Sequence, residues 1–259
     1  MSAAPAPASR SWLVTPRPRP RARLRVLCFA YAGGGSAAFT GWADALPADV
    51  ELSAVRLPGR ESRILQRPYT ALDELLPDLV SAVSSYCAEP YVLFGHSMGA
   101  LIAHAYAREL CDAGLRGPDH LIVSGRRAPQ LTHNRPLIHD LPDNELLDRL
   151  REFGGTTDEL LADPRTMRLV LPGLRADFQL NDTYRYTPQP RLDCPVTAFG
   201  GRQDSHVDEA GLAAWADRTT GPFTMRILDG GHFFLHSSQA ELLRAIKAVL
   251  HRTAGSTVA

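Results

Sequence analysis

Short apolar runs alternate with longer segments of helical spacing along most of this chain. The apolar runs cover residues 25–30, 50–57, 91–94, 120–125, 194–200 and 224–228. Segments with apolar residues three and four apart, the spacing of one helix face, cover residues 36–46, 72–87, 99–111, 209–217 and 238–251. Strands that alternate with helices are typical of a mostly parallel sheet with helices on both faces. The pattern therefore predicts an α/β fold.

One region, between residues 140 and 187, breaks this alternation. It contains no convincing strand, but helix spacing returns in two sets of apolar residues: Leu146, Leu147, Leu150 and Phe153, then Met167, Leu171, Leu174 and Phe178. We expect Pro172 to kink or split the second helix, because proline has no backbone N–H. Ligands of open α/β sheets bind at the C-terminal edge of the strands. We therefore interpret the region as a helical cap over that edge, with ordinary core helices as the alternative.

The N-terminal residues 1–23 differ in composition from the rest. They are rich in Ala, Pro and Arg and contain most of the cationic run TPRPRPRARLR. This composition does not favour packing, so we expect a flexible leader followed by one domain over residues 24–259. The leader lacks the apolar centre of a secretory signal, and the sequence has no apolar stretch of about 18 residues that could cross a bilayer. We expect a cytoplasmic protein without a membrane partner.

Charge and cysteine usage give no indication of nucleic-acid binding, a disulfide framework or a metal site. Lys and Arg total 28, as do Asp and Glu, so the net charge gives no indication of nucleic-acid binding. The four cysteines, Cys28, Cys87, Cys111 and Cys194, form no CxxC pair. We therefore predict neither a disulfide framework nor a metal site.

The segment GHSMG, residues 95–99, carries the main candidate chemistry. It follows an apolar run and opens a helix of small residues, as the GxSxG nucleophile elbow does. In that turn the serine has a strained backbone that exposes its hydroxyl. Gly95 and Gly99 are required because side chains at these positions would collide across the turn. We predict that Ser97 is a catalytic nucleophile.

A serine nucleophile needs a histidine base, and the base needs a carboxylate that fixes its tautomer. After the elbow the expected chain order is acid and then histidine. Asp204 lies in the loop after the penultimate predicted strand, and His232 lies in a glycine-rich turn after the last one. Both loops reach the same edge of a parallel sheet. We predict Asp204 as the acid and His232 as the base.

Neighbouring acids and histidines provide alternatives. Asp193 and Asp229 remain second choices for the acid, while Asp208 is placed to start the next helix and interact with its dipole. His236 is interpreted as structural. We expect the His96 side chain to point away from Ser97, because neighbours in an extended segment diverge.

An oxyanion hole completes such a site, and the elbow supplies one donor, the backbone N–H of Met98. The glycine-rich loop in CFAYAGGGSAAF, after the first predicted strand, supplies the second. We predict the N–H of Ala32, with Gly33 as the alternative. A phosphate-binding turn is the other interpretation of these glycines, but GxxxxGK[ST] and GxGxxG are both absent.

Seven segments, in order, resemble one known family. They are FAYAGGGSAAF, RLPGRESR, FGHSMGA, IHDLPDNELLDRL, LPGLRADFQLNDTYRY, FGGRQD and GGHFFL, and they extend over residues 24–251. Together they resemble the type II thioesterases of polyketide and nonribosomal peptide synthesis. These are α/β-hydrolases, so the resemblance implies that fold, with residues 140–187 as its mobile lid.

The resemblance also implies an activity. It is the hydrolysis of acyl thioesters from the phosphopantetheine arm of acyl or peptidyl carrier domains, which clears stalled or misprimed groups. By position, the family's triad falls on Ser97, Asp204 and His232, and its oxyanion donors on Ala32 and Met98. No metal or free cofactor is implied. The alternatives are a general carboxylesterase or lipase-like hydrolase, and a non-catalytic binding protein on the same fold.

Two expectations concern specificity and partners. Apolar residues of the insertion either line an acyl tunnel or face the core: Leu150, Met167, Leu174 and Phe178. As a separate hypothesis, arginines of the leader attract acidic carrier domains: Arg17, Arg19, Arg21 and Arg23.

Overall fold

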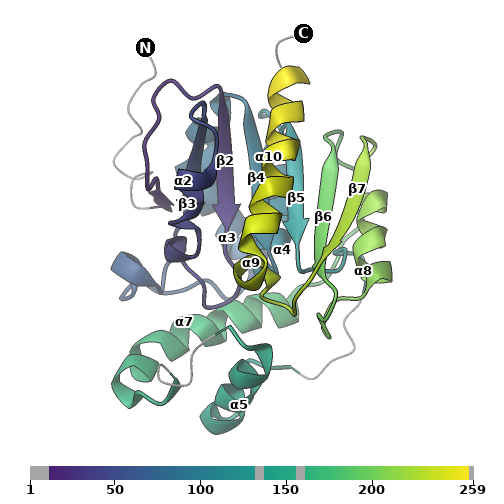
Figure 1. Cartoon of the computed structure of the whole chain (residues 1–259). Helices are drawn as coiled ribbons and strands as arrows, with labels where there is room; N and C mark the ends of the chain where they lie inside the picture. Colours follow the sequence, from purple (N-terminus) through teal and green to yellow (C-terminus); the bar gives the residue numbers. More distant parts are fainter. Residues whose placement is uncertain (1–11, 132–136, 156–160, 257–259) are drawn as a thin grey trace.

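A seven-stranded sheet forms the centre of the computed structural model, which describes residues 12–131, 137–155 and 161–256 (Figure 1). The strands are β1 (Leu13–Val14), β2 (Leu24–Phe29), β3 (Val50–Val55), β4 (Tyr91–His96), β5 (His120–Ser124), β6 (Val196–Gly201) and β7 (Phe223–Leu228). Their order is β1-β3-β2-β4-β5-β6-β7. β1 pairs antiparallel with β3, and the other neighbours are parallel. The six predicted strands and the mostly parallel sheet are confirmed.

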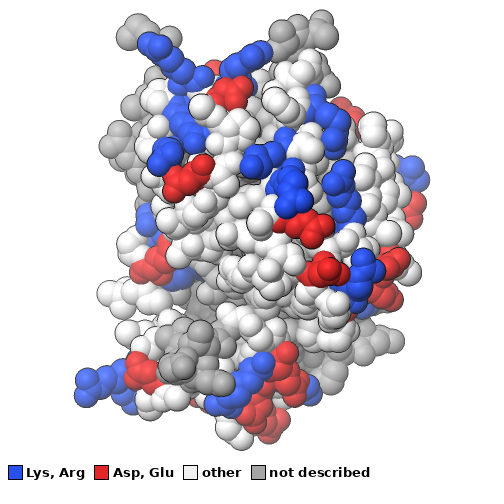
Figure 2. Space-filling model, in the orientation of Figure 1, with Lys and Arg blue, Asp and Glu red and all other residues white. Residues whose placement is uncertain are grey.

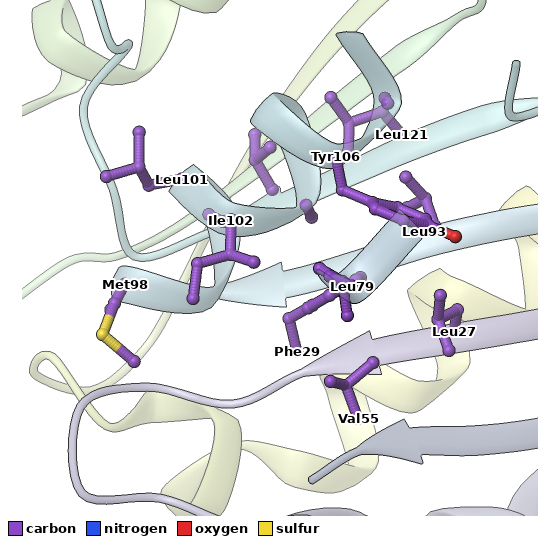
Figure 3. Close-up of a cluster of buried hydrophobic side chains, with 14 of the residues drawn as sticks. Leu27, Phe29, Val55, Leu79, Leu93, Met98, Leu101, Ile102, Tyr106 and Leu121 are labelled. Carbon is purple, nitrogen blue, oxygen red and sulfur yellow. The ribbon is translucent and has the colours of Figure 1, made fainter. Parts of the chain in front are cut away.

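Helices cover both faces of this sheet (Figure 1). One face packs against α3 (Leu72–Val83), α4 (Met98–Asp112) and α8 (Glu209–Ala213), and the other against α2 (Trp42–Ala45), α9 (Phe234–Ser237) and α10 (Gln239–Ser256). In the first layer, Leu79 of α3 and Tyr106 of α4 share a buried cluster with Leu93 of β4 (Figure 3). All six residues of β4 are buried. The strand that precedes Ser97 is therefore packed on both faces.

Some predicted helices are divided in the structure. Residues 36–46 form the 3₁₀ turn η1 (Ser36–Phe39) and α2, with Gly41 between them. Residues 209–217 form α8 and then η4 (Ala214–Arg218), and residues 72–87 form α3 and then η3 (Ser84–Ala88). Apolar spacing predicts which face is buried, but it does not distinguish a continuous α-helix from short turns with the same buried face.

Residues 12–23 pack against the domain, which differs from the flexible leader expected there. Trp12 is buried, and β1 pairs with β3, Leu13 opposite Val55. The guanidinium of Arg63 lies 4.2 Å from the centre of the Trp12 ring. Arg19 donates to the carbonyls of Ala43 at 2.8 Å and Val50 at 2.7 Å. An arginine fork can satisfy several carbonyls at once, so composition alone misjudged this segment. Residues 1–11 lie outside the described part of the chain.

Between β5 and β6, the described part of the chain includes the helices α5 (Asp143–Phe153) and α7 (Pro164–Thr183). They lie beyond the C-terminal ends of the strands, where the cap was predicted (Figure 1). Pro172 does not split α7, which continues through it. Next to it, Gly173 packs so closely on Gly59 that an added Cβ would lie 2.5 Å from the Gly59 carbonyl oxygen. The helix thus lies against the Gly59 backbone at the turn where Pro172 lacks its N–H donor.

Candidate active site

Ser97 occupies a strained turn between β4 and α4. Its φ is 54° and its ψ is −117°, a conformation that costs a residue with a side chain about 1–3 kcal/mol. An added Cβ at Gly95 would lie 2.2 Å from the carbonyl oxygen of Gly99, and one at Gly99 would lie 2.1 Å from that of Phe29. The two glycines are therefore required by close approach of the backbone. The turn has the geometry predicted for a nucleophile elbow.

Three predicted side chains meet at the C-terminal edge of the sheet. His232 Nε2 lies 3.0 Å from Ser97 Oγ, and His232 Nδ1 lies 2.9 Å from Asp204 Oδ2. Asp204 follows β6 and His232 follows β7, so neighbouring parallel strands deliver both. The Asp204 side chain is fully buried, and its Oδ1 accepts from the His206 N–H at 2.8 Å. In this arrangement Ser97 donates to His232, and His232 donates to Asp204.

The alternative acids have other partners. Asp208 caps α8 by accepting from the Gly211 N–H at 2.8 Å, as expected of a residue that starts a helix. Asp229 forms an ion pair with Arg202 at 3.1 Å. Asp193 precedes β6, at the opposite end of the sheet from Ser97. Asp204 is therefore the acid that the fold places against His232.

The other two histidines are held away from the Ser97 hydroxyl. His96 Nδ1 hydrogen-bonds Ser124 Oγ at 2.9 Å, and the His96 ring is fully buried. Burial, and then the neighbouring His232, hold the pKa of His96 well below its usual range. His236 hydrogen-bonds the Tyr31 hydroxyl at 3.0 Å, and burial lowers its pKa. A neutral His96 adds no positive charge beside His232, whose ring centre is 5.3 Å away.

The two predicted backbone donors of the oxyanion hole lie in the loop after β2 and at the start of α4. Met98 is the first residue of α4, where N–H groups have no partner within the helix. The Gly33 N–H donates to Asp177 Oδ2 at 2.8 Å, so it already has a partner. Ala32 therefore stays the predicted second donor, and it lies with Ser97 and Met98 in the wall of one cavity.

That cavity has a volume of about 500 Å³ and lies between the sheet edge and the cap. Its wall includes Ser97 and His232 and the four cap residues expected to line a tunnel or face the core: Leu150, Met167, Leu174 and Phe178. The same four residues are buried in one apolar cluster with Leu146 and Leu161. The two interpretations of these residues are thus compatible, because they form both the core of the cap and the lining of the cavity.

Sequence reasoning missed an aromatic contact and a buried ion pair in this wall. The His206 ring lies between Phe153 of α5 and His232, with ring centres 4.6 Å and 5.4 Å away. Arg60 pairs with Asp177 of α7 at 2.6 Å, and both are almost completely buried. Their positions in the sequence could have indicated them. His206 is two residues beyond Asp204, and Arg60 and Asp177 lie in two of the segments that carry the family resemblance.

A hydroxyl activated by a histidine–carboxylate pair is the arrangement used in nucleophilic acyl transfer. The strand order, the elbow and the acid and base loops together define a serine hydrolase of the α/β-hydrolase fold. The chain belongs to the thioesterase domain family, whose model matches residues 24–250. It is therefore an enzyme that hydrolyses thioesters.

Individual relatives agree with this family. The chain is 38% identical over 242 residues to a Brevibacillus parabrevis protein named linear gramicidin dehydrogenase LgrE, covering 92% of each. It is 37% identical over 226 residues to thioesterase PikA5 of Streptomyces venezuelae, covering 87% of this chain and 80% of PikA5. The solved structure of the type II thioesterase BorB, from the borrelidin biosynthetic cluster, matches with a TM-score of 0.85 and 34% identity over 94% of this chain and 97% of BorB.

Among the described residues, no helix combines the length and the apolar character needed to cross a bilayer.

Proposed function

We propose that this protein is a type II thioesterase that hydrolyses acyl groups from the phosphopantetheine arm of acyl or peptidyl carrier domains. In this role it clears stalled or misprimed polyketide and nonribosomal peptide synthases. The observation that carries the proposal is the apolar cavity of about 500 Å³ that contains Ser97, His232 and the cap residues. The names of PikA5 and BorB support the assignment to these pathways.

In the first half of the proposed reaction, Ser97 Oγ attacks the thioester carbonyl while His232 Nε2 takes the hydroxyl proton. The carbonyl oxygen becomes an oxyanion, and the N–H groups of Ala32 and Met98 donate to it. The tetrahedral intermediate then collapses and breaks the C–S bond. His232 returns its proton to the departing thiolate, which leaves an acyl ester on Ser97.

The second half repeats these roles with water. His232 removes a proton from water, the hydroxide attacks the acyl ester, and the Ser97 oxygen leaves with the proton from His232. Asp204 stays ionised throughout and holds the Nδ1–H, which fixes the tautomer that can accept from Ser97. The product is a free carboxylic acid. The reaction needs no free cofactor, because the phosphopantetheine arrives on the carrier domain.

The acyl group would lie against the apolar part of the cavity. Phe178, Leu174 and Met167 of α7 face Leu150 of α5 there. Each buried methylene of the acyl chain contributes about 0.8 kcal/mol of binding free energy. An apolar chamber of this kind favours aliphatic acyl groups over charged ones.

The hypothesis that leader arginines attract a carrier domain loses support. Arg17 pairs with Asp44 at 2.7 Å, and Arg19 is used on backbone carbonyls. Arg23 precedes β2, so it lies at the opposite end of the sheet from Ser97. Figure 2 shows basic side chains over α10 and toward the end where the termini lie, whereas acidic and basic side chains mix on the cap. We place carrier docking at the cavity instead.

The name dehydrogenase, carried by LgrE, is not transferred to this chain. A nicotinamide cofactor would place its pyrophosphate on the glycines that follow the first strand. Here the N–H of Gly33 donates to Asp177, and the N–H of Ala37 donates to Glu61 at 3.1 Å. Two carboxylates that already accept these amide protons would repel a pyrophosphate.

The proposal is tested by comparing kcat/KM for acyl thioesters on a phosphopantetheinylated carrier domain with that for the same acyl groups as simple oxygen esters. We expect the carrier thioester to be the better substrate, because the carrier adds contacts that a small ester lacks. Higher kcat/KM for the oxygen ester would favour a general carboxylesterase. If neither is hydrolysed and an organophosphonate fails to label Ser97, the protein is a non-catalytic member of its fold.

A further inference from the structure

A buried ion pair holds together the loop that contains the proposed oxyanion donor. Residues 31–37, here called the oxyanion loop, follow β2 and contain Ala32. Asp177 Oδ2 accepts from the Gly33 N–H at 2.8 Å, while its Oδ1 pairs with Arg60 at 2.6 Å. Arg60 also donates to the Gly34 carbonyl at 2.6 Å. The two side chains thus bind an N–H and a C=O of consecutive residues in the loop.

These contacts fix the peptide planes around Ala32. The N–H of Gly33 belongs to the peptide that joins Ala32 to Gly33, so its hydrogen bond sets the orientation of that plane. Gly33 has a φ of +74°, which few other residues would adopt. Glycine is conformationally permissive, so this turn needs outside contacts to hold one conformation. The Gly34 N–H closes the turn onto the Tyr31 carbonyl at 2.9 Å. Ala32 is therefore held from both sides, and its N–H has a fixed direction.

The residue next to Arg60 holds the other end of the same loop. Glu61 accepts from the Ser36 hydroxyl at 2.6 Å and from the Ala37 N–H at 3.1 Å. Its φ is +48°, an uncommon conformation for a residue with a side chain, and such strain persists only where the surroundings enforce it. The pair Arg60–Glu61 therefore binds the oxyanion loop at several points from one neighbouring turn.

The burial of the Arg60–Asp177 ion pair indicates a role other than stabilising the fold. Exposed fractions of 9% for Arg60 and 3% for Asp177 place both charges away from water. A buried ion pair is often no more stabilising than apolar residues of the same volume, since its attraction is offset by the loss of hydration. What the pair does supply is direction, because the planar guanidinium and the carboxylate each orient two partners.

We propose that Asp177 and Arg60 are positioning residues that aim the Ala32 N–H at the developing oxyanion. This inference rests on the proposed function for the role of Ala32. It also makes the middle of α7 part of the catalytic machinery, since Asp177 lies on the helix that lines the acyl cavity. The residues near Gly173 and Asp177 then form a fixed wall, while α5 makes no such contact with the oxyanion loop among the described residues.

The test compares three variants on a short-chain p-nitrophenyl ester, with kcat and KM measured separately. In Asp177→Asn we expect kcat to fall by about 10²-fold with little change in KM, because a donor misplaced by about 1 Å weakens only the transition state. Arg60→Lys keeps the charge but cannot bind two partners in the same plane, and we expect the same separation of kcat from KM. If Asp177→Asn does not fold, Arg60→Lys decides.

Asp182→Asn is the matched control. Asp182 lies on the same helix, has a side chain only 3% exposed, and accepts from the N–H of Ile138 at 2.7 Å. It does not contact the oxyanion loop, so we expect its loss to lower the unfolding temperature while kcat stays within about threefold of wild type. An alkyl boronic acid, which forms a tetrahedral anion on a serine, provides a second readout. Its affinity should fall in Asp177→Asn by the same factor as kcat and stay unchanged in Asp182→Asn.

Two results would overturn the proposal: an unchanged kcat in the folded Asp177→Asn or Arg60→Lys variant, or an equal loss of kcat in Asp182→Asn. The ester assay also separates this inference from the proposed function. If the wild type hydrolyses p-nitrophenyl esters but not carrier thioesters, the carrier function fails while the comparison of variants still decides the role of the ion pair.

Discussion

The sheet edge and the cap form the two sides of one cavity, but they are held in place differently. Ser97 follows a strand whose six residues are all buried. In the cap, α5 buries only Leu146 and Leu150, and its outer face carries exposed ion pairs such as Arg149–Glu152. Exposed pairs contribute about 0–1 kcal/mol each. The nucleophile therefore follows a fully buried strand of the main core, whereas the cap that faces it has a smaller core.

The cap itself is not uniform. α7 is joined to the rest of the molecule by the Gly59–Gly173 contact and by the Arg60–Asp177 ion pair, whereas α5 meets the sheet edge through the ring of Phe153. This difference suggests that changes in α7 affect catalysis and changes in α5 affect mainly access. The comparison can be tested with substitutions on each side.

The largest effect is expected at the sheet edge. Ser97→Ala should lower kcat by at least ~10³-fold, because the members of a triad act as a unit. Stability should hardly change, since the substitution removes one oxygen atom and leaves the backbone strain as it was. Ester hydrolysis and a thermal unfolding curve measure the two quantities. An active Ser97→Ala variant would refute the assignment of the nucleophile.

The free energy of unfolding should respond differently to changes in the core of the sheet and in the core of the cap. Leu93 of β4 and Leu146 of α5 are both fully buried. Leu93→Ala should lower the free energy of global unfolding by about 2–5 kcal/mol through the cavity it leaves. Leu146→Ala should have a smaller effect on global unfolding, because the cap can open locally before the sheet unfolds. Chemical denaturation with hydrogen exchange measures both, and equal global losses would show that cap and sheet unfold as one unit.

The next largest expected effect is on selectivity for acyl chain length, which we expect to depend on residues of the cap. Phe178→Ala should raise KM for a long-chain acyl thioester by about tenfold with kcat nearly unchanged, because it removes apolar contact made equally before and during reaction. A short acyl group should be affected less. Leu169→Ala, on the exposed side of the same helix, is the control. A uniform change of KM across chain lengths would mean that Phe178 does not line the acyl site.

The remaining effect is a pH dependence of stability, and it concerns two buried histidines of the sheet region. Burial, followed by the charges of Arg218 and Arg108, lowers the pKa of His104 to about 3, and burial followed by Arg252 lowers that of His120 to about 4. Each histidine is neutral when folded but gains a proton below about pH 6.5 when unfolded. Stability is therefore full above that pH and falls as the pH drops toward 4.

We expect a slope of up to about 1.4 kcal/mol per pH unit for each of these two histidines. His104→Gln should reduce the slope measured by denaturant unfolding between pH 6.5 and 4.5. An unchanged slope would show that His104 takes up its proton in the folded state.

Sequence patterns alone predicted six of the seven described strands in their order and the three side chains that meet at the edge of the sheet. Ser97 was predictable because its neighbours Gly95 and Gly99 have a steric purpose that few other turns share. Asp204 and His232 were predictable because loops that follow parallel strands must reach the same edge. Periodicity and turn chemistry are local properties, so they depend only on residues that are close together in the sequence.

Which side chains hold the oxyanion loop and which segments pack depends on contacts between distant parts of the chain. Arg60 and Asp177 are 117 residues apart, and no local pattern pairs them. Residues 12–23 fold against β3 because the backbone groups of an edge strand and the carbonyls near Val50 were available there. Likewise, α7 continues through Pro172, and its next residue, Gly173, packs on Gly59 from a distant part of the chain. Such outcomes depend on what lies opposite a residue in space, which the order of residues along the chain does not state.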